Sequence, residues 1–99
     1  MGKKKFNLLF VEDDTNLGFV IKDQLEVSGY NVSWALNGKD GLKLALNETF
    51  DVAVLDVMLP IMDGFTLAEE LIQLKPELPF LFLTAKSMLE DKLLSLIHI

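Results

Sequence analysis

The 99-residue sequence predicts a single α/β domain whose parallel sheet carries helices on both faces, a three-layer α/β/α arrangement. Three observations predict it. Short apolar runs typical of strands alternate with segments whose apolar residues recur every three or four positions. No linker, internal repeat or low-complexity tract interrupts this alternation. Hydrophobic residues make up 51% of the chain, which is enough for one core and argues against disorder.

Four apolar runs are expected to form the strands, and each ends near a polar or turn residue. They occupy residues 6–11, 32–35, 52–55 and 80–83. A run that is apolar at nearly every position is typical of a strand buried on both faces, as in a parallel sheet.

The first helix is expected over residues 15–28, with Asp14 as its N-cap and Gly29 as the signal that ends it. The second is expected over residues 38–47, where Asn37 is the cap. Its side chains expected to face inward are Leu42, Ala45 and Leu46.

The third helix is expected from about residue 65 to residue 74, ending before Pro76. Its side chains expected to face inward are Phe65, Ala68, Leu71 and Ile72. A fourth helix is expected to begin near Ser87.

Composition excludes several classes of function. Nine basic residues against fifteen acidic ones give a net charge of −6, which disfavours nucleic-acid binding by this domain. No apolar run approaches the roughly 20 residues that span a bilayer, so no membrane segment is expected. With no cysteine and no secretory apolar region, a cytoplasmic location is expected.

Acidic side chains follow two of the predicted strands. Glu12 and Asp13 come after the first, Asp56 comes after the third, and Thr84 follows the fourth. In an open parallel sheet the ligand site lies beyond the carboxyl ends of the strands. Crowded carboxylates repel one another unless a cation neutralises them, and Mg²⁺ takes one or two carboxylates together with phosphate oxygens.

This arrangement suits phosphoryl chemistry. Either Glu12 or Asp13 can share Mg²⁺ with Asp56, and the backbone carbonyl of Met58 can supply another oxygen ligand. A carboxylate next to the ion can act as a nucleophile on phosphorus. Asp56 is therefore the expected phosphoryl acceptor, and the hydroxyl of Thr84 is expected to contact the phosphoryl oxygens.

Three segments, LLFVEDD, VLDVMLPIMDG and PFLFLTAK, resemble the receiver domain of two-component response regulators. The resemblance implies a flavodoxin-like fold with strand order 2-1-3-4 and a receiver domain over residues 5–99. It implies that Asp56 takes a phosphoryl group from a sensor histidine kinase, with Mg²⁺ as cofactor. By the same resemblance Glu12 and Asp13 are the acidic pair, with Asp13 the direct metal ligand, Met58 gives a carbonyl ligand and Thr84 is the switch hydroxyl.

The resemblance also implies a regulatory switch rather than a turnover enzyme. A DNA-binding output domain is expected outside this chain.

The sequence departs from the family near its C-terminus. The family has a fifth strand ending in a lysine, then a fifth helix, whereas this sequence reads LLSLIHI and stops. Neither Lys86 nor Lys92 takes that lysine's place. We therefore expect an incomplete receiver that lacks the fifth β-α unit, has a divergent tail over residues 93–99 and is phosphorylated weakly. Such a chain is expected to form a homodimer, with domain swapping as one route, in which the tail covers exposed core.

Two other functions compete with this prediction. One is a degenerate receiver that serves only as a dimerisation or interaction module. The other is an aspartate-nucleophile phosphatase, but the haloacid-dehalogenase-like group needs a second Asp two residues after the first, where this chain has Met58.

Overall fold

The computed structural model describes residues 5–57, 59 and 64–83, and over these residues strands and helices alternate as predicted. The elements are β1 (Asn7–Val11), α1 (Thr15–Val27), β2 (Asn31–Ala35), α2 (Gly38–Asn47), β3 (Val52–Asp56), α3 (Gly64–Leu74) and β4 (Phe80–Leu83). The strands form one parallel sheet in the order β2-β1-β3-β4. The predicted fold class and strand order are therefore confirmed.

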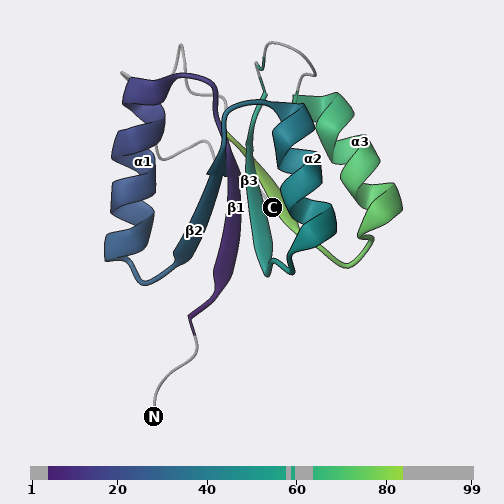
Figure 1. The fold of residues 1–99 in the computed structure, drawn as a ribbon, viewed down its shortest axis with the longest axis horizontal. Coiled ribbons are helices and arrows are strands. Elements are labelled where there is room, and N and C mark those ends of the chain that lie inside the picture. The colour runs from purple at the N-terminus through teal and green to yellow at the C-terminus, as the bar shows by residue number, and fades with distance from the viewer. Residues whose placement is uncertain (1–4, 58, 60–63, 84–99) are drawn as a thin grey trace.

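Two layers of helix enclose the sheet. Figure 1 shows α1 on one face and α2 with α3 on the other. Side chains of β1 alternate between the two faces, because successive strand residues point in opposite directions. Leu9 and Val11 belong to the cluster beneath α2 and α3, whereas Leu8 and Phe10 belong to the cluster beneath α1. The core thus has one cluster of buried residues on each face.

The residues that the sequence analysis assigned to the two ends of α1 do begin and end this helix. The side chain of Asp14 accepts hydrogen bonds from the backbone N–H groups of Asn16 and Leu17, both at 3.0 Å. These bonds satisfy donors that a helix start otherwise leaves open. At the other end Gly29 adopts a φ of 106°, a conformation that glycine reaches without strain. The predicted cap and stop are both confirmed.

The predicted inward faces of α2 and α3 are partly wrong. Ala45, Ala68 and Leu71 are buried, but Leu46 is 55% exposed, Phe65 57% and Ile72 51%. Phe65 and Ile72 are seven residues apart and therefore share one stripe of α3, which lies beside its buried stripe. The helical period was predicted correctly, but the predicted rotation of each helix about its axis, relative to the sheet, was wrong.

The third strand ends one residue later than predicted, at residue 56 instead of 55. Asp56 is itself the last residue of β3 and pairs with Leu83 of β4. The helix expected near Ser87 and the tail over residues 93–99 lie outside the described residues. Among the helices that the structure describes, none has the length and apolar character needed to cross a membrane.

Candidate functional site

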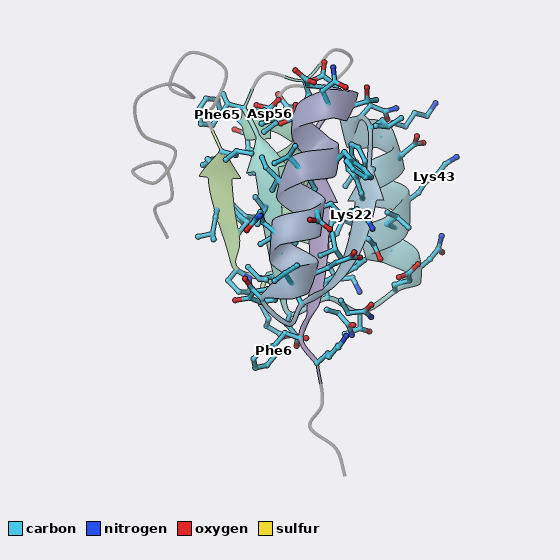
Figure 2. All side chains as sticks on the ribbon, turned by 90° about the vertical axis from the view of Figure 1, so that its left-hand side faces the viewer. Phe6, Lys22, Lys43, Asp56 and Phe65 are labelled. Atoms are coloured by element: carbon cyan, nitrogen blue, oxygen red, sulfur yellow. The ribbon has the colours of Figure 1, made fainter. Side chains whose placement is uncertain are left out.

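Three carboxylates meet at the carboxyl edge of the sheet. β1 and β3 are parallel neighbours, and Val11 at the end of β1 pairs with Leu55. The residues that follow these two positions therefore emerge side by side. One carboxylate oxygen from each of Glu12, Asp13 and Asp56 lies within 4.8 Å of the others. The structure thus brings together the three acids that the sequence singled out, at the end of the molecule where Figure 2 labels Asp56.

Two of these acids are deeply buried, which makes their grouping costly. Glu12 is 0% exposed and Asp56 is 1% exposed. Buried carboxylates are strongly unfavourable unless a cation or hydrogen-bond donors compensate their charge. The charge of this cluster therefore needs compensation, either from neighbouring groups of the protein or from a bound ligand.

The donor set fits Mg²⁺. This ion binds oxygen ligands at about 2.0–2.1 Å, so two ligand oxygens on opposite sides of it lie roughly 4.2 Å apart. One oxygen from each of Glu12, Asp13 and Asp56 lies within 4.8 Å of the others, so small side-chain adjustments bring these three oxygens to one ion. Hard carboxylate oxygens are also the ligands that Mg²⁺ prefers.

Glu12 is held by its backbone and by its side chain. Its N–H donates to the carbonyl of Ala35 at 3.1 Å, and its own carbonyl accepts from Trp34 Nε1 at 3.0 Å. Its Oε2 accepts from the backbone N–H of Asp14 at 3.0 Å. The end of β2 and the N-cap of α1 therefore hold Glu12, the first residue of the acidic pair, in place.

Asp56 is positioned by the start of α3 as well as by its strand. The N–H of Gly64 donates to the carbonyl of Val57 at 2.9 Å, which ties the helix start to the end of β3. A Cβ at Gly64 would collide with the carbonyl oxygen of Asp56 and would lie 2.8 Å from the Cα of Val57. Only glycine permits this close approach of helix and strand.

Two residues of the site's surroundings, Gly64 and Trp34, were not among the site residues predicted from the sequence. A glycine that opens a helix a few residues after an acidic strand end is a usable signal of close approach. For Trp34, nothing local in the sequence shows that its indole reaches Glu12. Met58 and Thr84 lie outside the described residues, so the structure does not place them.

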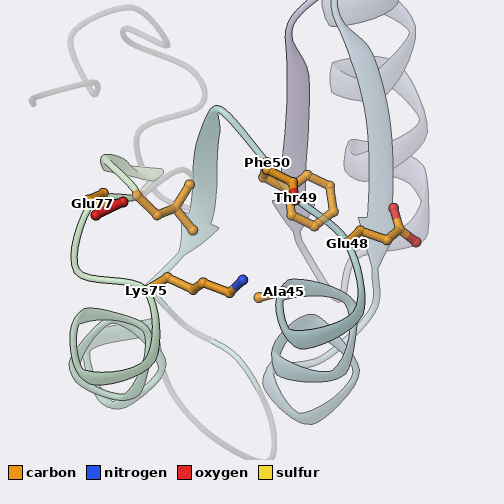
Figure 3. A pocket seen from close by; sticks show the side chains of 7 residues that line it. Ala45, Glu48, Thr49, Phe50, Lys75 and Glu77 are labelled. Carbon is orange, nitrogen blue, oxygen red and sulfur yellow. The ribbon is translucent and has the colours of Figure 1, made fainter.

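A pocket elsewhere is a poor candidate for function. It has a volume of about 160 Å³ and lies between the C-terminal parts of α2 and α3 (Figure 3). Its lining comes from the end of α2 and from the segments that lead into β3 and β4: Ala45, Glu48, Thr49, Phe50, Lys75, Glu77 and Leu78. It therefore lies at the opposite edge of the sheet from the carboxylates. Pockets for small molecules usually measure about 300–1,000 Å³.

Comparison with known proteins connects this geometry to a family. The family model described as the response regulator receiver domain matches residues 8–97. The transcriptional regulatory protein RprY of Bacteroides fragilis (strain YCH46) is 42% identical over 88 residues, which cover 89% of this chain and 37% of RprY. The alkaline phosphatase synthesis transcriptional regulatory protein PhoP of Bacillus subtilis (strain 168) is 43% identical over 96 residues, 97% of this chain and 39% of PhoP.

Solved structures agree with the sequence comparisons. The non-phosphorylated HemR receiver domain from Leptospira biflexa is 39% identical with a TM-score of 0.74, over 87% of this chain and 73% of that one. The response regulator protein TrrA from Thermotoga maritima, solved in complex with Mg²⁺ and BeF, is 28% identical with a TM-score of 0.79. That match covers 91% of this chain and 78% of TrrA. The chain spans less than half the length of RprY and of PhoP.

Proposed function

Because the chain belongs to the response regulator receiver domain family, we propose that Asp56 accepts a phosphoryl group from a sensor histidine kinase in an Mg²⁺-dependent reaction. One observation carries the proposal: a carboxylate oxygen from each of Glu12, Asp13 and Asp56 lies within 4.8 Å of the others. Such a cluster supplies both a nucleophile and a metal site at the edge of the sheet where ligands of this fold class bind.

The acidic pair and the acceptor share the work of binding the ion. Asp13 and Asp56 are the proposed direct ligands, together with the backbone carbonyl of Met58, and Glu12 is the proposed further carboxylate of the site. When bound, Mg²⁺ neutralises the carboxylates and the charge of the incoming phosphoryl group. The TrrA structure in complex with Mg²⁺ and BeF supports this ion, because TrrA has a similar fold.

In the transfer step a carboxylate oxygen of Asp56 forms a bond to phosphorus. The bond between phosphorus and the imidazole nitrogen of the donor breaks, and that nitrogen keeps the electron pair. Gly64 and β3 hold Asp56 in place during this step, because a shift of the Asp56 backbone would displace the start of α3. Thr84 is the proposed donor of a hydrogen bond to a phosphoryl oxygen.

The proposed partners follow from the relatives. RprY and PhoP are named as transcriptional regulatory proteins, which supports a DNA-binding output domain in the remainder of the protein. We further propose a cytoplasmic location and a homodimer. The family match favours a regulatory switch over the aspartate-nucleophile phosphatase that the sequence left open.

Incubation with a small phosphodonor tests the proposal without the kinase. The chain is mixed with phosphoramidate and MgCl₂, and intact mass and peptide mapping locate the added phosphoryl group. We expect one group on Asp56, dependence on Mg²⁺, and no labelling of Asp56→Asn. Asp51→Asn is the matched control, because Asp51 is exposed and lies just before the same strand.

Two outcomes would contradict the proposal. Labelling of Asp56→Asn equal to that of the wild type would show that the acceptor is another residue. Absence of labelling in the wild type would favour the degenerate receiver that acts only as an interaction module.

A further inference from the structure

Trp34 lies where β1, β2 and α1 come together. It is a residue of β2, which forms one edge of the described sheet, and it pairs with Phe10 of β1. The two rings stack with their centroids 6.1 Å apart and an angle of 27° between their planes. Both rings therefore lie on the α1 side of the sheet, just below the acidic cluster.

The indole is also in close contact with α1. A Cβ at Gly18 would collide with Cζ2 of Trp34 and would lie 2.7 Å from Cε2. Glycine inside a helix costs about 1 kcal/mol relative to alanine. Its presence at position 18 therefore has a physical reason, since no larger residue leaves room for the indole in this position.

The indole N–H points at the backbone from which the acidic pair emerges. Trp34 Nε1 donates to the carbonyl of Glu12 at 3.0 Å, while the N–H of Glu12 donates to the carbonyl of Ala35. Because the peptide group is planar, fixing this carbonyl also fixes the direction of the N–H of Asp13. The hydrogen bond from the indole therefore sets the orientation of the peptide group that joins Glu12 to Asp13.

We propose that Trp34 is a positioning residue, whose indole N–H holds the peptide between Glu12 and Asp13 in the geometry that Mg²⁺ binding requires. This inference rests on the proposed function. A ligand group that is already oriented pays less ordering entropy when the ion binds, so it binds more tightly. The indole acts on metal affinity, through the backbone, and has no part in the phosphoryl transfer itself.

The size of the effect follows from the loss of one neutral hydrogen bond. Such bonds contribute modestly, and losing one corresponds to a change in affinity of about two- to tenfold. We therefore expect the dissociation constant for Mg²⁺ to rise by that factor when the N–H is removed. At saturating Mg²⁺ the maximal rate of phosphorylation by phosphoramidate should stay the same.

The experiment can remove the N–H and keep the ring, because the chain contains one tryptophan. Expression in a tryptophan auxotroph with benzothienylalanine replaces that N–H by sulfur. Trp34→Phe provides a second variant without the N–H. Titration calorimetry with MgCl₂ compares both with the wild type, and the phosphorylation rate is measured as a function of Mg²⁺ concentration.

Phe10→Leu is the matched control, because it removes the stacking partner and leaves the indole N–H in place. It should lower the midpoint of urea unfolding and leave the affinity for Mg²⁺ unchanged. Equal Mg²⁺ affinity in the wild type and the benzothienylalanine protein would overturn the inference and leave the proposed function standing. A wild-type chain that binds no Mg²⁺ would overturn both.

Discussion

Replacing Asp56 by asparagine should stabilise the protein when no metal is present. Asparagine has nearly the same shape as aspartate but carries no charge, so the substitution relieves the repulsion of Asp56 with Glu12 and Asp13. One carboxylate oxygen from each of the three residues lies within 4.8 Å of the others. At an effective dielectric constant of 20, two unit charges at that distance repel each other by about 3.5 kcal/mol.

The measured gain must be smaller than the sum of two such pairs. The wild-type protein can relieve the repulsion by binding a proton, and protonating an ordinary carboxyl group at pH 7 costs about 4 kcal/mol. This cost caps the gain. Burial of the new amide at a position that is 1% exposed offsets part of it. We expect the free energy of unfolding to rise by about 1–4 kcal/mol in EDTA.

Urea unfolding followed by circular dichroism at low ionic strength measures this effect, with and without excess MgCl₂. Mg²⁺ should stabilise the wild type, because a ligand that binds only the folded state raises the free energy of unfolding. It should stabilise Asp56→Asn much less, so the advantage of the variant shrinks or reverses. Asp51→Asn serves as the control, since it should lose stability slightly and leave the Mg²⁺ response intact. Charge repulsion within the cluster is ruled out if Asp56→Asn is no more stable than the wild type in EDTA and responds to Mg²⁺ as strongly.

Three further predictions concern other parts of the chain. Gly64→Ala should cost about 1–3 kcal/mol of stability through overpacking against the β3 backbone and should slow phosphorylation of the folded protein. Gly29→Ala is its control, because it should lose stability by strain at its positive φ while the phosphorylation rate stays unchanged. Equal phosphorylation rates in the two variants would contradict the role of Gly64. Asp14→Ala should lower the free energy of unfolding by about 1 kcal/mol through loss of the α1 cap, with Mg²⁺ affinity retained, and urea unfolding with calorimetry checks both. Sedimentation equilibrium should show a dimer, and a purely monomeric profile would count against the proposed homodimer.

The order of the elements was determined by the sequence alone. Apolar runs and helical periodicity are local properties, so the alternation that gives a parallel sheet could be predicted without coordinates. The end signals of α1 were equally local. Asp14 caps the helix through neighbours two and three residues away, and Gly29 supplies a backbone conformation that other residues avoid. Convergence of the acids at one edge then followed from the rule that parallel strands end together.

Only the tertiary structure decided which helix faces are buried and which distant residues touch the site. A helical period does not specify the rotation of a helix against the sheet, so Leu46 and Phe65 could be assigned to the wrong face. The bond from Trp34 to Glu12 joins residues 22 positions apart in the chain. It depends on how β2 and α1 pack against β1, so no short stretch of sequence shows it. The glycine that opens α3 is visible in the sequence, but its approach to the Asp56 carbonyl follows from how α3 packs on β3.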